Sequence, residues 1–460
     1  MSYREMGIDI LPRPYPRTAI LGLLAFSACA QLPELDPLLL DAGAQVPTMA
    51  GATLGKKESR TLLANKSDGG ELLANHIAVA EAVTKNPLTA GNEATLLYDG
   101  PATYRAMFKA IENAKDHINL EFYIIEDDEI GQRFADLLIK KQNEDVQVNL
   151  IYDGIGSAAT SEAFFARLKE AGINILEFNP VNPAEGLDLN HRDHRKIVVV
   201  DGKLAFTGGI NISGVYSQGS SVGSANKDAK KPGWRDTQIE IAGPAAAEFQ
   251  ELFISTWRKE KGPPLVERNY FPDVKGAGND LVRVLGSSPD KPLPTIYLTL
   301  LSAIAHAQKT VYITMGYFVP DRQTMDALKA AAKRGVEVAL ILPSYSDFWA
   351  VFHAGRANYD ELLESGVVIY ERQDTLLHSK TIVIDGVWST VGSSNLDWRS
   401  FLHNDEVNAV VLDEEFGEEM EAMFARDLAQ SRQIKLDEWK DRGVTLRVKE
   451  WAAQIWEYWL

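Results

Sequence analysis

Two stretches of this chain carry the same polar residue types at the same spacing. In each stretch a Lys follows a His by two residues, and an Asp, a Gly and an Asn follow it by 7, 14 and 17 residues. A polar pattern of this length is not expected to occur twice by chance. The matched residues are His194, Lys196, Asp201 and Asn211 in the first copy, and His378, Lys380, Asp385 and Asn395 in the second.

These residue types suit an anionic phosphodiester. Lys supplies positive charge to phosphoryl oxygens, and Asn adds a side-chain donor. If the two copies meet about a pseudo-twofold axis, one imidazole can attack the phosphorus. The other can protonate the leaving alkoxide and then deprotonate an incoming alcohol or water. The scheme requires no metal ion or other cofactor, because the two Lys fill that electrostatic role.

The elements around each motif are predictable from local pattern. Residues 197–200 and 381–384 are β-branched runs typical of buried strands, and Asp-Gly pairs follow them as tight turns. Because His194 and Lys196 are alternate residues of one strand, their side chains point to the same side. Asp201 and Asp385 belong to the candidate catalytic set, but their position favours a turn-forming or charge-balancing role.

The repeat extends beyond the motifs. Residues 104–120 and 297–313 each read as a helix running into a strand, and a second helix and strand follow in both halves. This alternation predicts an α/β protein with a largely parallel sheet and helices on both faces. We divide the body near residue 275, in a stretch rich in Gly, Pro and Asp.

Composition limits the partners. The chain has 460 residues, which allows two to three domains, and its net charge is 47 − 64 = −17. Proteins that bind long nucleic acids usually carry a basic face. No nucleic-acid partner is therefore expected, although a local basic cleft remains compatible with an acidic body.

The N-terminus has the pattern of a targeting segment. Arg13 and Arg17 precede an apolar run, residues 19–28, that is too short to span a bilayer and ends on Cys29, the only cysteine. The pattern resembles a bacterial lipoprotein signal over residues 1–28, with Cys29 lipidated. It predicts an envelope protein anchored to the bacterial membrane and facing the periplasm. The alternative is a buried apolar segment. Residues 29–92 then read as a tether with some helix.

Both motifs match the pattern His-x-Lys-x4-Asp-x6-Gly-[Gly/Ser]-x-Asn and so resemble the phospholipase D superfamily, over residues 93 to 440. The runs 190–196 and 395–406 are similar to those of bacterial cardiolipin synthases. The resemblance implies two α/β/α sandwich domains, 93–275 and 276–440, related by a pseudo-twofold axis with the active site at their interface. It also implies a phosphohistidine intermediate.

The resemblance further implies roles for individual residues. In relatives a carboxylate downstream of each motif orients the His of that motif, which points to Glu406 for His378 and to Asp236 for His194. The first-half His is the nucleophile in many relatives, and the second-half His is the acid and base. The substrate-binding set comprises Asn211, Asn395 and the position that holds Gly209 in one copy and Ser393 in the other. A hydroxyl contact to phosphate is therefore expected from one half only.

The leading hypothesis is a phosphatidyltransferase that makes cardiolipin from phosphatidylglycerol. A hydrolytic phospholipase D, another phosphodiesterase such as a nuclease, and a non-catalytic lipid-binding envelope protein are the alternatives. Two segments stay open. Residues 216–233 form either a gating loop or an unrelated surface loop. The C-terminal segment 441–460, which ends in an aromatic stripe, either packs on the body as a final helix or rests at a membrane interface.

Overall fold

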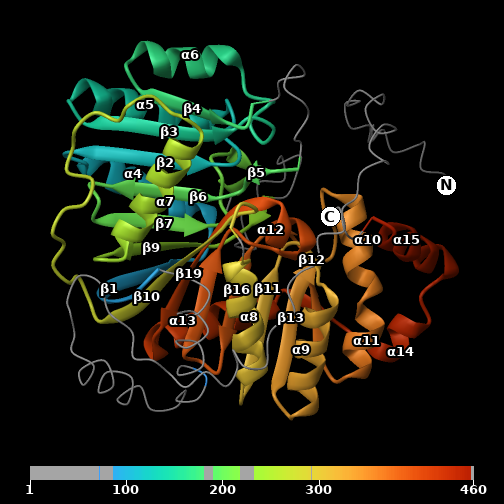
Figure 1. Cartoon of the computed structure of the whole chain (residues 1–460). Coiled ribbons are helices and arrows are strands. Elements are labelled where there is room, and N and C mark those ends of the chain that lie inside the picture. Colours follow the sequence, from blue (N-terminus) through green and yellow to red (C-terminus); the bar gives the residue numbers. More distant parts are fainter. Residues whose placement is uncertain (1–71, 73–85, 181–189, 218–232, 292, 457–460) are drawn as a thin grey trace. The chain divides into compact units, whose positions relative to one another are not determined.

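The computed structural model describes residues 72, 86–180, 190–217, 233–291 and 293–456 (Figure 1). The expectations for residues 1–71, Cys29 included, and for most of the loop 216–233 lie outside the described residues. Residues 88–92 belong to the first strand, so the first half begins earlier than residue 93. No helix in the described part of the chain is long and apolar enough to cross a membrane.

The described residues from 86 onward form one large mixed sheet with helices packed against it. The first half contributes β1 (Leu88–Leu97), β2 (His117–Phe122), β3 (Gln147–Asp153), β4 (Asn174–Phe178), β6 (Lys196–Val200), β7 (Leu204–Gly208) and β9 (Gln238–Ala242). The second half contributes β10 (Asp280–Ser287), β11 (Thr310–Met315), β13 (Glu337–Pro343), β14 (Val368–Arg372), β16 (Lys380–Ile384), β17 (Trp388–Gly392), β19 (Asn404–Leu412) and β20 (Ser431–Ile434).

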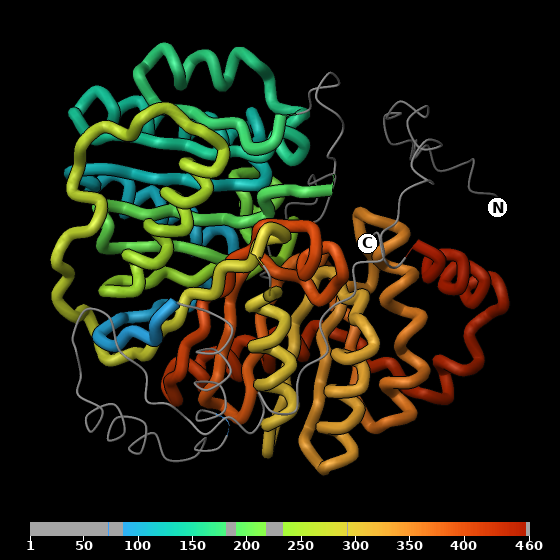
Figure 2. Tube along the Cα trace, in the orientation of Figure 1, coloured from blue at the N-terminus to red at the C-terminus, as the bar shows by residue number. Residues whose placement is uncertain are grey.

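The strand order is palindromic. β1 and β10 pair antiparallel at the centre. Outward from β1 the order is β9-β7-β6-β2-β3-β4, and outward from β10 it is β19-β17-β16-β11-β13-β14, with β20 at the far edge. Figure 2 traces the two halves, blue to yellow-green and yellow to red. This is the order that a pseudo-twofold axis between β1 and β10 produces, and the predicted α/β class is confirmed.

The prediction of a largely parallel sheet is wrong. Among the described strands longer than two residues, the parallel pattern is confined to β2-β3-β4 and β11-β13-β14, with their preceding helices. The motif strands β6 and β16 each turn back through an Asp-Gly hairpin, and a hairpin makes its two strands antiparallel. The motif strands also pair antiparallel with β2 and β11.

Helices cover the sheet in both halves. They are α4 (Gly100–Asn113), α5 (Glu129–Asn143), α6 (Glu162–Glu170) and α7 (Ala246–Lys259) in the first half. The second half has α8 (Thr295–His306), α9 (Arg322–Lys333), α10 (Trp349–Ala357), α11 (Tyr359–Glu364), α12 (Trp398–Leu402), α13 (Glu414–Leu428), α14 (Leu436–Lys440) and α15 (Val444–Gln454).

The motif strand β6 is buried on both faces. Val198 and Val200 pack in a cluster with residues of α4, α5 and α6, whereas Ile197 and Val199 pack in a second cluster with residues of α7. Burial on both faces explains why the strand is apolar throughout rather than alternating. The second cluster also contains residues of β16, β17, β19 and α13, so the two halves share a core as well as a sheet.

Candidate active site

Two short parallel strand pairs cross between the halves. β5 (Arg192–Asp193) lies beside the start of β19, with Asp193 opposite Asp405. β15 (Leu376–Leu377) lies beside β8 (Trp234–Arg235), with Leu377 opposite Arg235. In both pairs the next residue is a motif His on one strand and a carboxylate on the other. The backbone thus brings each His to a carboxylate of the opposite half.

Hydrogen bonds complete this crossed arrangement. Nδ1 of His194 lies 3.0 and 3.1 Å from the carboxylate oxygens of Glu406. Nδ1 of His378 lies 2.7 Å from Oδ2 of Asp236. Asp236 and Glu406 therefore contact motif His residues as expected, but the expected pairing within each half is wrong. Spacing along the chain could not show the exchange, because β5 and β15 are only two residues long.

The carboxylates fix which imidazole nitrogen is available. A carboxylate oxygen accepts the hydrogen bond at Nδ1 of each His, so Nδ1 carries the proton and Nε2 keeps its lone pair. His194, His378, Asn211 and Asn395 line one cavity of about 410 Å³. The site therefore presents two imidazoles to a common space, each held from behind by a buried carboxylate.

Burial and charge set the protonation of the site. Burial, and then the charge of Lys196, outweigh Glu406 and lower the pKa of His194 to about 4. Burial also lowers the pKa of His378, and Lys380 adds to that effect. Burial on its own would raise the pKa of Glu406, but His194, Lys196 and Ser393 together bring it down to about 2. Glu406 is thus ionised and the His residues are neutral in the resting site.

The two Lys of the motifs are buried beneath aromatic rings. Each ammonium donates a hydrogen bond to the carbonyl of the His two residues before it. Nζ of Lys196 lies 5.3 Å from the ring centroid of Tyr123, and Nζ of Lys380 lies 5.8 Å from that of Tyr317. Burial lowers the pKa of Lys196 to about 7 and that of Lys380 to about 8. An anion bound nearby would restore both charges.

The two Asn differ in their contacts. Oδ1 of Asn211 accepts from the backbone N–H of Ile124, and its Nδ2 donates to the Tyr216 hydroxyl. Oδ1 of Asn395 is buried and has no hydrogen-bond partner among the described residues. Leaving a buried polar atom unpaired costs about 1–3 kcal/mol. A ligand group that pairs with Asn395 would recover part of that cost.

Gly209 and Ser393 lie against the carboxylates that contact the motif His residues, Asp236 and Glu406 respectively. The Ser393 hydroxyl is buried and donates to Glu406, and Ser393 is absent from the residues that line the described cavity. The expected contact between this hydroxyl and phosphate is therefore not supported. A Cβ at Gly209 would collide with the carboxylate oxygens of Asp236. The first half thus carries Gly because its carboxylate occupies the space of a side chain.

Asp201 and Asp385 lie at the opposite ends of the motif strands. Both have positive φ, 53° and 54°, and sit in the hairpin turns. Asp201 accepts hydrogen bonds from the backbone N–H groups of residues 115–117, and Asp385 from those of residues 308–310. Neither lines the cavity. This geometry supports the turn-forming role and not a catalytic one.

Comparison with known proteins identifies the family. The family described as "Cardiolipin synthase, PLD-like domain" matches residues 107–257 and 300–428, one segment in each half. The chain belongs to this phospholipase D-like family. It is therefore an enzyme of the phospholipase D superfamily.

Curated relatives and a solved structure agree with this membership. The chain is 36% identical over 382 residues to a cardiolipin synthase of Halalkalibacterium halodurans, covering 82% of this chain and 74% of the relative. It is 35% identical over 361 residues to cardiolipin synthase 2 of Bacillus anthracis, covering 78% and 69%. A phosphatidylserine synthase of Haemophilus influenzae Rd KW20 shares the fold, with a TM-score of 0.63 at 15% identity over 83% of this chain and 99% of that one.

The sequence pattern of this phospholipase D-like enzyme did not reveal the aromatic residues of the site. The ring of Tyr123 lies 5.1 Å from that of His194, and the ring of Tyr317 lies 5.7 Å from that of His378. Trp234 and Tyr216 also line the cavity. A signal was present, because Phe122-Tyr123 and Tyr317-Phe318 form matching aromatic pairs in the two halves.

Proposed function

We propose that this protein is a phosphatidyltransferase that forms cardiolipin from two molecules of phosphatidylglycerol. The observation that carries the proposal is the pair of buried His–carboxylate contacts whose two His residues line one cavity. A double displacement at phosphorus requires one imidazole that acts as the nucleophile and a second imidazole that donates and then accepts a proton. The curated relatives named cardiolipin synthase support the choice of lipid.

The first displacement uses His194 as nucleophile. Its Nε2 attacks the phosphorus of phosphatidylglycerol, the bond to the glycerol head group breaks, and a phosphatidyl-His194 forms. Protonated His378 gives its Nε2 proton to the leaving glycerol oxygen. The bound phosphodiester anion favours that protonated form, because an opposite charge nearby stabilises an imidazolium. Lys196 and Lys380 stabilise the charge that develops on the phosphoryl oxygens.

In the second displacement the bond between phosphorus and His194, which formed in the first, is broken. His378, now neutral, takes the proton from the head-group hydroxyl of a second phosphatidylglycerol. That oxygen attacks the phosphorus, the bond to His194 breaks, and cardiolipin leaves. Both His residues return to their starting protonation states, so the cycle balances. Water in place of the second lipid would give phosphatidic acid, which makes exclusion of water the step that separates transfer from hydrolysis.

Lipid product analysis tests the proposal. Full-length protein incubated with phosphatidylglycerol should yield cardiolipin and glycerol by mass spectrometry. His194→Ala should yield neither, and His378→Ala should form both about 10²–10⁴-fold more slowly. His306→Ala is a matched control, because His306 lies at the end of α8 and contacts the Ser302 carbonyl. Phosphatidic acid as the sole product would identify a hydrolytic phospholipase D. Cleavage of DNA or RNA with no lipid product would identify a nuclease.

We further propose that Cys29 is lipidated and anchors the protein to the bacterial envelope, facing the periplasm. The support is the short apolar run that ends on the only cysteine of the chain. An alkyne fatty-acid probe should label the wild-type protein in cells and leave Cys29→Ala unlabelled. Equal labelling of the two would reject the anchor without bearing on the catalytic proposal.

A further inference from the structure

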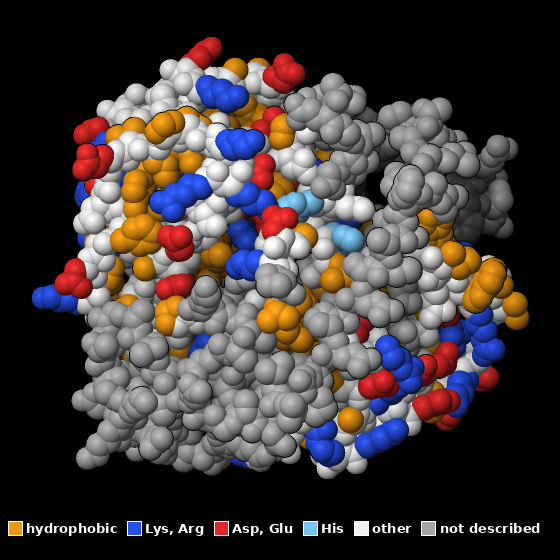
Figure 3. Space-filling view, viewed as in Figure 1, with side chains coloured by type: hydrophobic (Ala, Val, Ile, Leu, Met, Phe, Trp, Pro, Cys, Tyr) orange, Lys and Arg blue, Asp and Glu red, His pale blue; other side chains and the backbone are white. Residues whose placement is uncertain are grey.

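Exposed hydrophobic side chains gather in one part of the second half. Among the described residues, thirteen large hydrophobic side chains are exposed. Three lie in residues 345–349 and six in residues 444–456. These two segments meet where α10 packs against α15, with Val351, Ala354 and Ala453 in one small cluster. Figure 3 shows hydrophobic side chains collected over α15, at the right of the view.

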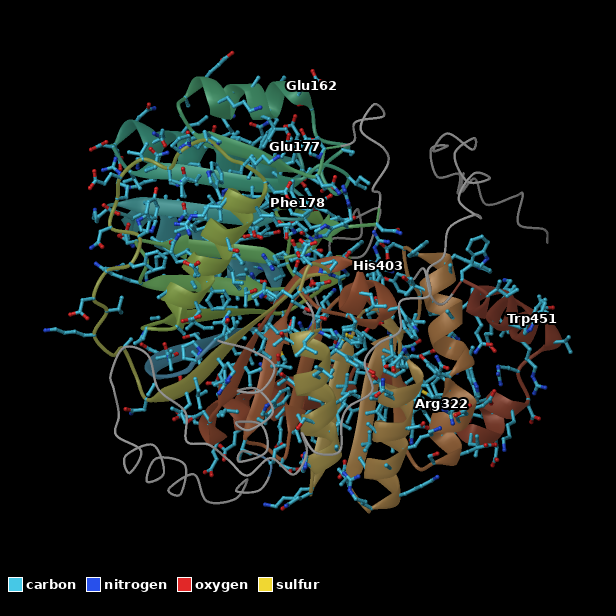
Figure 4. The ribbon with its side chains drawn as sticks, viewed as in Figure 1. Glu162, Glu177, Phe178, Arg322, His403 and Trp451 are labelled. Atoms are coloured by element: carbon cyan, nitrogen blue, oxygen red, sulfur yellow. The ribbon has the colours of Figure 1, made fainter. Side chains whose placement is uncertain are left out.

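The apolar face of α15 is exposed, whereas an ordinary surface helix buries its apolar face. Val444, Val448, Trp451 and Ile455 follow the spacing 4, 3 and 4, which places them in one stripe, and all four are exposed. The buried face instead carries the helix's one carboxylate, Glu450, which pairs with Arg442 at 2.9 Å. Trp451 is 65% exposed and points away from the body in Figure 4. The C-terminal helix thus packs on the body through Ala453, yet its apolar stripe faces outward.

The exposed charged side chains of α15 are all positive. Arg447 and Lys449 are exposed, and Glu450 is buried. This local positive charge contrasts with the net charge of −17 for the chain. A helix with Trp and aliphatic side chains on one side and exposed cations is the pattern of an interfacial helix on anionic lipid.

The patch is continuous with the cavity. Phe348, immediately before α10, is half-exposed and lines the cavity, as do its neighbours Asp347 and Val351. Asp347 accepts a hydrogen bond of 2.7 Å from the hydroxyl of Tyr317, whose ring lies beside His378. Trp349, the first residue of α10, is 50% exposed. One surface therefore runs from the outer face of α15 to the mouth of the catalytic cavity.

We propose that α15 and the first turn of α10 form a docking surface that rests in the head-group layer of an anionic phospholipid bilayer. Trp side chains favour that layer, and exposed cations are attracted to anionic lipid there. Docking sets the cavity mouth at the depth of the phosphodiesters. The inference rests on the proposed function for its choice of lipid substrate, but vesicle binding is measurable without any reaction.

Vesicle binding of the full chain tests the surface. Trp451→Ser/Ile455→Ser is compared with Phe271→Ser, which removes an exposed apolar side chain from a loop of the first half. Both are made with Cys29→Ala, so that a covalent anchor does not contribute. The double variant should bind phosphatidylglycerol vesicles about 100-fold or more weakly in co-sedimentation, and the control should bind normally. Unchanged binding by the double variant overturns the proposal.

A charge variant provides a second, milder test. Arg447→Gln/Lys449→Gln should weaken binding to phosphatidylglycerol vesicles by roughly fivefold per cation and leave binding to phosphatidylcholine vesicles unchanged. Equal effects on both lipids would contradict the charge argument. If a second copy of the chain covers the patch, Trp451→Ser/Ile455→Ser will turn a dimer into a monomer in light scattering without loss of vesicle binding, and the proposal fails.

Activity separates docking from chemistry. The double variant should lose cardiolipin synthesis on vesicles but keep that on dihexanoyl phosphatidylglycerol dissolved as monomers. Loss of both activities with vesicle binding intact would overturn the docking role. A wild type that binds vesicles through this surface yet makes no cardiolipin would reject the proposed function and leave the docking surface standing.

Discussion

His194 and His378 hold equivalent positions in the two halves, but their surroundings differ. The residue two places before the carboxylate is Asn404 beside His194 and Trp234 beside His378. Asn404 donates to Glu406 at 3.2 Å, whereas the Trp234 ring lies 5.1 Å from the ring of His378. The Tyr216 hydroxyl lies 3.5 Å from Nδ1 of His378. One His is backed by a polar network, and the other is enclosed by aromatic rings.

This difference is consistent with the different roles of the two imidazoles in the proposed mechanism. Glu406 receives hydrogen bonds from Ser393 and Asn404 as well as His194, so it stays ionised and orients a neutral His194 for attack. Around His378 the rings of Tyr216, Trp234 and Tyr317 lie within 5.1–6.2 Å of the imidazole, so the acid and base of the proposed mechanism has a largely apolar surrounding. The comparison supports His194 as nucleophile and His378 as acid and base. Variants of the two His residues and of their carboxylates separate these two roles.

The largest effect is expected from removal of the His residues. With a phosphatidyl ester of p-nitrophenol the leaving group needs no proton, so His378→Ala should still release nitrophenol in a burst. His194→Ala should release none, and with phosphatidylglycerol His378→Ala should lose about 10²–10⁴-fold in rate. Stopped-flow absorbance measures the burst, and mass spectrometry of the peptide that carries the phosphatidyl group measures the covalent intermediate. A covalent adduct on His194→Ala would reverse the assignment.

The carboxylates test the crossed pairing itself. Glu406→Gln should slow the nitrophenol burst by about 10²–10³-fold, because it disturbs the orientation of His194. Asp236→Asn should leave the burst nearly intact and slow turnover of phosphatidylglycerol, because its partner is His378. Pairing within each half predicts the opposite result for the two variants. The same burst assay distinguishes the possibilities.

The stability of the protein should depend on pH through His194. Its folded pKa of about 4 lies below the unfolded value of 6.5, so the neutral form favours folding. This contribution is fully present above pH 6.5 and is lost as pH falls toward 4, at about 3 kcal/mol in total. Denaturant unfolding at several pH values should show that His194→Gln loses about that much less stability over the window. Parallel curves for the two proteins would show that His194 is not buried as described.

The smallest effects concern the position that differs between the motifs. Ser393→Ala removes one hydrogen bond to Glu406, which should lower activity by about tenfold. Gly209→Ala places a Cβ against the Asp236 carboxylate and should cost more, because the backbone on both sides is buried. Steady-state rates for the two variants measure the contrast. Equal rates would mean that Asp236 can move away freely.

Local pattern predicted the parts of the site that local physics determines. The β-branched runs became strands, and Asp201 and Asp385 became turn residues because an Asp-Gly pair accepts positive φ. The exchange of Glu406 and Asp236 was not predictable in this way. Glu406 lies 212 residues from His194 along the chain, and the pairing depends on a two-residue strand that leaves no periodic signal.

The prediction that the strands pair in parallel was wrong for a related reason. Alternating helices and strands favour parallel pairing, and that held for β2, β3 and β4. The hairpins after the motifs interrupt the alternation of helices and strands. Their Asp-Gly turns are visible in the sequence and indicate antiparallel pairing. The contact of the Ser393 hydroxyl could not be predicted from the sequence. The hydroxyl faces the Glu406 carboxylate, which belongs to a later strand, and not a ligand.

The pairing of β1 with β10 has a consequence for handling the protein. A chain cut near residue 275 would leave each half with an exposed edge strand, ten residues long in the first half and eight in the second. The unpaired N–H and C=O groups of these strands would pair with another strand. Each fragment would also lack the carboxylate for its own His. Isolated halves should therefore aggregate or assemble with one another, and limited proteolysis at that linker should leave the two fragments associated.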